Sequence, residues 1–227
     1  KDELLFTVKN NRETLRLSIS ANASLPLAYF TGSNKPGPLT APNFCMLLRK
    51  HIGTGRIVKV EQPGLERVIE FTIEHLDEMG DVCRKRLIVE LMGKHSNIIF
   101  CKEDGTILDS IKHVSAQVSS VREVLPGRPY FIPQTMEKAD PLTVTEEAFS
   151  ALLHGTPAPV QKALYQKLTG ISPVVGAELC HLASIDADLP ASQLEEKELC
   201  HLYRRLSFMM EDIKNANFSP NIVYRDT

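Results

Sequence analysis

Apolar and polar residues alternate along the first half of the chain, which is the pattern of half-buried strands. In Val68–Ile73, the apolar Ile69, Phe71 and Ile73 occupy every second position and predict one buried face. Asn10-Asn11 and Glu103–Gly105 have the composition of tight hairpin turns. Strands are expected at Glu3–Lys9, Glu13–Ser20, Arg56–Glu61, Arg67–Glu74, Arg84–Met92, Asn97–Cys101 and Thr106–Ser110. A proline-rich loop at Asn34–Pro42 precedes one helix, expected from Pro42 to about His51.

The pattern changes to a helical one from about Asp140. Apolar residues then recur at spacings of three and four, most regularly at Leu199, Leu202, Leu206, Met209 and Ile213. Helices are expected at Thr145–His154, Pro159–Thr169, Pro173–Ser184 and Ser192–Asn215. Strands followed by helices predict an α+β fold rather than a βαβ nucleotide-binding fold.

The change of pattern near residues 135–142 predicts a domain boundary. We expect a β-rich domain at residues 1–138, an all-helical domain at 139–217 and a tail at 218–227. A chain of 227 residues is long enough for two such domains.

Composition excludes several classes of protein. With 43% hydrophobic residues and a net charge of −2, the chain is neither disordered nor uniformly basic. Five cysteines without a CxxC pair argue against a disulfide framework and favour the reducing cytoplasm. No apolar run reaches the roughly 20 residues that a membrane helix needs, so no membrane association is expected.

Charge is nevertheless distributed unevenly. Pro42–Val60 contains Arg49, Lys50, Arg56 and Lys59 and no acidic residue, and Arg84–Lys102 is also mainly basic. Ser184–Asp212 has seven acidic residues against three basic ones. This asymmetry fits a β-rich domain that faces a polyanion, although ordinary solvated charges would give the same counts.

Leu168–Gly176, between two predicted helices, approximates a helix-hairpin-helix connection. A glycine hairpin of this kind turns backbone amides toward a phosphate, with Gly170 and Ser172 as the candidate contacts. Ser172 also suits an ordinary helix N-cap before Pro173, so a simple connector remains an equal alternative.

Other candidate chemistry is weaker. Cys180-His181 and Cys200-His201 are unsuited to zinc, because adjacent helical residues point about 100° apart; no metal or cofactor is expected. His95-Ser96 is expected to form a hydrogen-bonded turn rather than a catalytic pair. The adjacent Glu66 and Arg67 form either a surface ion pair or a recognition pair for phosphate or guanine, and their spacing does not decide between the two.

Three strings together resemble one family closely. They are Phe44–His51 (FCMLLRKH), Gly64–Arg67 (GLER) and Val89–Ile99 (VELMGKHSNII), supported in order by Lys112-His113, Leu125–Gly127, Gly170–Pro173 and Phe218–Asn221. The family is NFACT, some of whose members have long been called fibronectin-binding proteins. The resemblance covers nearly the whole chain and implies that the family's opening helix, coiled coil and C-terminal NFACT-R domain lie outside it.

The resemblance implies a fold and a function. The expected fold is an N-terminal β-sandwich similar to that of MutM-type DNA glycosylases, followed by a helix-hairpin-helix domain. The expected function is ribosome quality control: non-catalytic binding of a large ribosomal subunit obstructed by peptidyl-tRNA, and recruitment of alanyl-tRNA for C-terminal tailing of the stalled chain. The expected partners are the large subunit, its rRNA and tRNA, and the fragment itself is expected to be monomeric.

The resemblance also assigns residues. The family's tRNA-contacting Asp-Arg pair corresponds to Glu66 and Arg67, where Glu66 keeps the charge and adds a methylene. Further ribosome or tRNA contacts are expected from Arg49, Lys50, Glu90, Leu91, Met92, Gly93, Lys94, His95 and Asn97. Two alternatives remain: a glycosylase-like DNA-binding protein and a fibronectin-binding surface adhesin. The first is weakened because this chain does not show the N-terminal Pro-Glu start of MutM-like enzymes.

Overall fold

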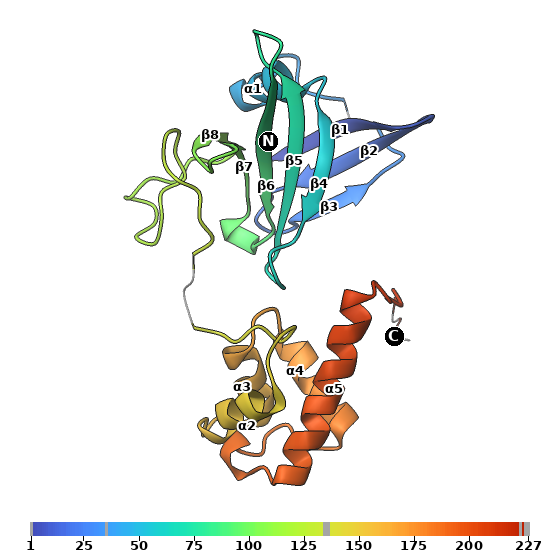
Figure 1. Ribbon diagram of the computed structural model, residues 1–227, viewed down its shortest axis with the longest axis vertical. Coiled ribbons are helices and arrows are strands. Elements are labelled where there is room, and N and C mark those ends of the chain that lie inside the picture. Colours follow the sequence, from blue (N-terminus) through green and yellow to red (C-terminus); the bar gives the residue numbers. More distant parts are fainter. Residues whose placement is uncertain (1, 35, 134–136, 223, 225–227) are drawn as a thin grey trace. The chain divides into compact units, whose positions relative to one another are not determined.

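The computed structural model describes residues 2–34, 36–133, 137–222 and 224 (Figure 1). The chain divides into two compact units, Lys1–Pro63 with Arg67–Gln134 and Gly64–Glu66 with Thr135–Thr227. Gly64–Glu66, which lies between two strands in the sequence, therefore belongs to the second, helical unit.

The first unit contains two antiparallel sheets. The smaller has the order β1 (Glu3–Asn10), β2 (Glu13–Ser20) and β3 (Leu27–Phe30). Asn11, with φ of 54°, makes the tight turn between β1 and β2. The larger sheet has the sequential order β4 (Arg56–Glu61), β5 (Val68–Leu76), β6 (Val82–Glu90), β7 (Asn97–Lys102) and β8 (Ile107–Ser110). Helix α1 (Asn43–Ile52) packs against β5.

The central strands of the larger sheet are buried on both faces. On one face, Phe71 and Phe100 pack with Ile19 of the smaller sheet and with Phe44 and Leu48 of α1. On the other face, a second cluster is covered by the segment that follows β8; it contains Val68, Ile88, Ile99, Cys101, Ile107 and Val124. The buried face that the alternation in Val68–Ile73 predicted is present, with Ile69, Phe71 and Ile73 in the first cluster. The burial of Val68 on the opposite face, at 1% exposure in the second cluster, was not predicted.

The second unit is helical, with α2 (Glu146–His154), α3 (Val160–Lys167), α4 (Pro173–Ala183) and α5 (Glu196–Lys214) around one core. Thr145 caps α2, and Glu195 and Glu198 form a capping box at the start of α5. The buried stripe of α5 runs through Leu199, Leu202, Leu206 and Met210, while Met209 and Ile213 pack at its margin.

The α+β class is confirmed, and the predicted strands and helices are present within a few residues of their expected bounds. Strand β3 was not predicted, and α5 begins later than expected because Ala191–Gln193 forms a separate 3-10 turn. Residues 134–136, beside the predicted domain boundary, lie outside the described residues, as do residues 223 and 225–227 of the predicted tail. In the described part of the chain, no helix combines the length and apolarity needed to cross a bilayer.

Candidate nucleic-acid interface

One end of the larger sheet brings Arg67 next to the Leu91–His95 segment. The antiparallel register pairs Val68 with Glu90, so Arg67 lies opposite Leu91 where β5 begins and β6 ends. The Leu91 N–H donates to the Arg67 carbonyl at 2.8 Å. Two segments that carried separate predictions are therefore held together by main-chain pairing.

The Gly93–His95 3-10 turn presents two basic side chains at this end. Gly93 has φ of +57°, a conformation that glycine adopts without steric cost. The buried Ser96 hydroxyl accepts from the Met92 N–H at 2.8 Å, and the His95 N–H donates to the Met92 carbonyl. Lys94 and His95 are exposed. The prediction of a hydrogen-bonded turn at His95-Ser96 is thus confirmed.

Asn97 and Lys112 stabilise the end of this turn through hydrogen bonds to main-chain groups. The Asn97 amide oxygen accepts from the Lys112 and Ile98 N–H groups, and its NH2 donates to the Lys112 carbonyl at 2.9 Å. The Lys112 ammonium donates to the carbonyls of Ala21 and Ser96. Lys112 thereby ties the end of β2 to the end of the larger sheet, a role for which the sequence offered only the short Lys112-His113 string.

Glu90 is completely buried, at 0% exposure, and its carboxylate accepts hydrogen bonds from Arg122 and Tyr130. Asn97 is 2% exposed and fully engaged. We therefore revise the expectation that Glu90 and Asn97 touch RNA, because neither side chain is exposed to solvent. Leu91, Met92 and Gly93 are half-buried, and their proposed contact with RNA stays a prediction.

Several of the basic side chains counted in the sequence are paired with carboxylates, three of them across strands. Arg56 and Arg84 share Glu74 at 3.3 and 2.9 Å, and Arg86 binds Glu70 through two nitrogens. Lys50 and Lys59 pair with Glu78 and Glu61. These pairs offset much of the local positive charge, so the expected basic face carries less net positive charge than its count of Lys and Arg residues indicates.

Arg67, Lys94 and His95 differ from those residues. Among the described residues, none of the three has an ion-pair partner, and all three are exposed. Arg49 is also exposed and has only a weak contact with the Met46 sulfur. The exposed cations Arg67 and Lys94, with the His95 imidazole next to Lys94 in the sequence, suit a phosphate or a base edge.

The helix-hairpin-helix connection forms as expected between α3 and α4. Gly170 has φ of +74°, and the Ser172 hydroxyl caps α4 by accepting from the Val175 N–H at 3.2 Å. Gly176 lets α4 approach α3, because a Cβ there would lie 2.8 Å from the Gln161 carbonyl oxygen. A Cβ on Gly170 would lie 2.4 Å from that of Leu65, so Leu65 covers this glycine. Both candidate residues have structural roles, and their contact with phosphate stays a prediction.

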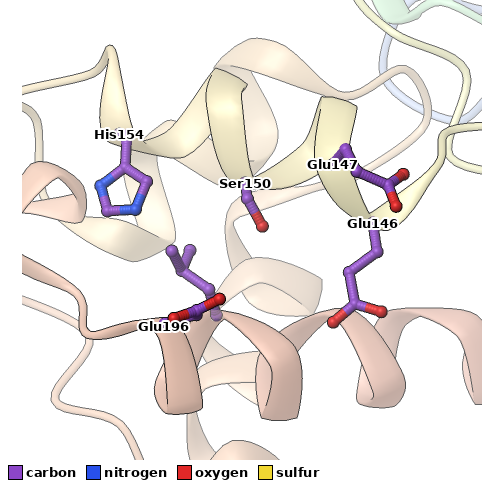
Figure 2. Close-up of a pocket in the computed structure, with 6 residues that line it drawn as sticks. Glu146, Glu147, Ser150, His154 and Glu196 are labelled. Atoms are coloured by element: carbon purple, nitrogen blue, oxygen red, sulfur yellow. The ribbon is translucent and has the colours of Figure 1, made fainter.

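The helical unit also contains an open cleft of about 540 Å³ between α2 and the start of α5. Figure 2 shows the carboxylates of Glu146, Glu147 and Glu196 around it, with Ser150 and His154 alongside. None of the sequence-predicted site residues lines this cleft. Within the described residues, no group of three or more His, Cys, Asp or Glu side chains is arranged to hold a metal ion.

Comparison with known proteins defines the class. A family model described as the NFACT N-terminal and middle domains matches residues 1–227. The chain therefore belongs to the NFACT family, as its sequence motifs predicted.

Particular relatives agree with this assignment. Over 223 residues the chain is 33% identical to the Rqc2 homolog RqcH of Bacillus subtilis (strain 168), covering 98% of this chain and 37% of that protein. It is 27% identical over 200 residues to the archaeal Rqc2 homolog aRqcH of Methanocaldococcus jannaschii, covering 86% of this chain and 28% of that protein. The chain thus spans between 28% and 37% of the length of the curated relatives it matches.

A solved structure is similar over most of the chain. It is the N-terminal part of the fibronectin/fibrinogen-binding protein of Streptococcus suis, with a TM-score of 0.76 and 30% identity, covering 92% of this chain and 73% of that one. The fibrinogen binding protein of Staphylococcus aureus has the same TM-score at 28% identity, covering 94% of this chain and 71% of that one.

Proposed function

We propose that this chain is the RNA-binding part of a cytoplasmic ribosome quality control factor. In this role it binds the large ribosomal subunit obstructed by peptidyl-tRNA and recruits aminoacyl-tRNA, alanyl-tRNA in particular, for tailing of the stalled chain. It acts by binding and forms no covalent bond itself. Membership of the NFACT family and 33% identity to an RqcH protein support this role.

The observation that carries the proposal within this chain is the position of Arg67. Its backbone is fixed by the Leu91 hydrogen bond, and its side chain is exposed beside the turn that bears Lys94 and His95. A guanidinium offers five donors in a planar fork, which matches a phosphate or the Hoogsteen edge of guanine. The neighbouring Glu66 carboxylate is able to accept from a base amino group.

The test is Arg67→Ala in the full-length protein. We expect the variant to fold normally and to lose roughly 1–3 kcal/mol of tRNA affinity, about five- to 150-fold, if the contact is bidentate. Tailing of stalled chains should be abolished, while binding to the large subunit weakens less because other phosphate contacts remain. Arg67→Lys should recover only part of the affinity, because an ammonium keeps the charge without the fork.

Arg128→Ala is the matched control. Arg128 is an exposed arginine of the same unit that pairs with Glu123 at 2.9 Å, and the proposal gives it no contact with RNA. Unchanged tRNA binding and tailing in folded Arg67→Ala would remove Arg67 from the site. Duplex DNA of equal length, titrated over a salt series, serves as the competitor that distinguishes a tRNA-binding protein from a glycosylase-like one.

A second candidate function rests on the descriptions of the structural relatives. Because two of them are named for binding fibronectin or fibrinogen, a surface adhesin is the alternative. Immobilised fibronectin and tRNA, offered to the same full-length protein, separate the two functions. Saturable binding to fibronectin that survives Arg67→Ala, together with no binding to tRNA, would favour the adhesin.

A further inference from the structure

A buried ionic network lies directly behind the Arg67 end of the sheet. Both oxygens of the Glu90 carboxylate are engaged: one accepts from the Arg122 guanidinium and the other from the Tyr130 hydroxyl at 3.0 Å. The Glu90 side chain is 0% exposed and that of Arg122 is 10% exposed. Removing one partner from such a buried pair is strongly destabilising, because it leaves a charge without compensation.

Arg122 and Tyr130 both come from the segment between β8 and the end of the first unit. This segment is irregular, with an isolated pairing of Val114 and Val124 in place of a strand. Arg122 also donates to the Phe131 carbonyl at 2.6 Å, and its guanidinium carbon lies 5.5 Å from the centre of the Tyr130 ring. Burial and the Glu90 carboxylate raise the pKa of Tyr130, which keeps its hydroxyl protonated as a donor. The network therefore joins the segment to the final residue of β6.

From Glu90 the connection to the exposed cations is continuous. The next residue, Leu91, holds the Arg67 carbonyl through its amide. Met92 packs in the same apolar cluster as Tyr130, and its amide donates to Ser96, which closes the turn carrying Lys94 and His95. Arg122 and Tyr130 thus hold the start of this segment, at Glu90, and Tyr130 shares the apolar cluster of Met92.

We propose that Arg122 and Tyr130 are positioning residues of the RNA-binding end. Acting through Glu90, they hold Leu91 so that Arg67, Lys94 and His95 present one fixed surface to RNA, and they touch no RNA themselves. This inference rests on the proposed function, and it assigns the 111–133 segment a part in binding.

The experiment compares Arg122→Gln and Tyr130→Phe with Arg128→Gln in the full-length protein. Arg128 is the control because it lies on the same segment but forms an exposed pair with Glu123. Hydrogen exchange of the Leu91 and Ser96 amides reports the position of the strand end without any RNA. We expect exchange at Leu91 to rise at least tenfold in Arg122→Gln, less in Tyr130→Phe, and to stay unchanged in Arg128→Gln.

Titration with tRNA supplies the readout that a merely structural role would not move. The folded Arg122→Gln protein should bind tRNA about five- to 50-fold more weakly, with a shallower dependence of log K on log salt because phosphate contacts are lost. Its effect should be strongly non-additive with that of Arg67→Gln, because both changes remove the same contact. Arg122→Lys should restore part of the affinity.

The outcomes are separable. Unchanged Leu91 exchange in Arg122→Gln, or additive losses in the double variant, would overturn the positioning role. If Arg122→Gln fails to fold, Tyr130→Phe decides, since it deletes only the hydroxyl that donates to Glu90. Absence of tRNA binding by the unmodified protein would refute the proposed function, whereas the exchange data would still decide whether Arg122 positions Leu91.

Discussion

Ion pairing, rather than charge alone, separates the basic residues of the β-rich unit. Arg56 and Arg84 both pair in register with Glu74, and Arg86 binds Glu70, which lies two residues from its register partner on β5, so each cation is compensated within the sheet. Arg67 lies just beyond the paired strands and has no such partner among the described residues. A polyanion therefore meets an uncompensated charge at Arg67, which is why its loss should weaken tRNA binding more than the loss of a paired arginine.

Gly170→Ala should destabilise the helical unit strongly. The substitution places a Cβ in a left-handed conformation and within 2.4 Å of the Leu65 Cβ, so backbone must move. Together these effects should cost roughly 2–4 kcal/mol, measured by urea denaturation followed at the helical circular dichroism band. Gly127→Ala, in the β-rich unit and followed at that unit's own transition, is the control: its φ is +81° but open space surrounds it, so about 1–2 kcal/mol is expected. Equal losses at the two positions would contradict the packing explanation.

Cys101 and Cys180 should resist alkylation in the native protein. Burial raises the pKa of the Cys101 thiol to about 12 and that of Cys180 to about 11, and neither side chain is exposed. The nucleophilic thiolate is therefore scarce at pH 8. Mass spectrometry after iodoacetamide treatment should find label first at the partly exposed Cys45, Cys83 and Cys200, and at all five cysteines in urea. Early label at Cys101 would show that the larger sheet opens readily.

At the scale of elements, the sequence predicted most strands and helices because their apolar periods are regular. Strand β3 (Leu27–Phe30) escaped because four residues after Pro26 are too short to show a period. The burial of the second face of β5 was not predicted, for a different reason. Val68 is covered by residues from the distant 111–133 segment, and local alternation carries no information about such a cover.

The candidate site was also predicted only in part. The family motifs identified Arg67, Lys94 and His95, which remain exposed, and also Glu90 and Asn97, which are buried. The partners Arg122 and Tyr130 lie 32 and 40 residues from Glu90 in the sequence. A pairing over that distance depends on the fold, so no local pattern revealed that Glu90 is internal.

His51, in helix α1, should make the stability of the β-rich unit fall in mild acid. Burial first, and then the nearby charge of Lys50, lower the pKa of His51 below its usual value of 6.5; Lys85 and His75 act in the same direction, and Glu78 opposes them. Because the unfolded chain binds this proton at the ordinary pKa, stability should fall as pH decreases from about 6.5 through the lowered folded value.

Denaturation of the unmodified chain and of His51→Asn between pH 5 and 7.5 tests this expectation. The variant should show a smaller loss of stability on acidification, because it has no proton to gain at this position. The control is His113→Asn, which replaces an exposed histidine that bonds Asp109 at 2.6 Å. An identical pH dependence in His51→Asn would exclude His51 as the cause.

At the scale of the whole molecule, the two units have separate apolar cores. The buried residues of the helical core are all distinct from those of the two clusters in the β-rich unit. Calorimetry should therefore resolve two unfolding transitions, because each unit has its own set of buried core residues. Val89→Ala should destabilise the β-rich unit and Leu202→Ala the helical unit. Each loss should be roughly 2–5 kcal/mol, as is typical of large-to-small core changes, with Val89 toward the low end.

Leu65→Ala gives the sharpest test of this division. In the sequence Leu65 lies between β4 and β5, so sequence position alone assigns it to the β-rich domain. In the structure it packs against the helical core and lies over Gly170. We expect the substitution to lower the helical transition by roughly 1–3 kcal/mol, somewhat less than a fully buried leucine because Leu65 is only partly buried, and to leave the β-rich transition almost unchanged. Ile69→Val, four residues further along on β5 and packed against the first unit's core, should do the reverse. A Leu65→Ala protein in which only the β-rich transition moved would show that Gly64–Glu66 folds with its sequence neighbours and not with the helices.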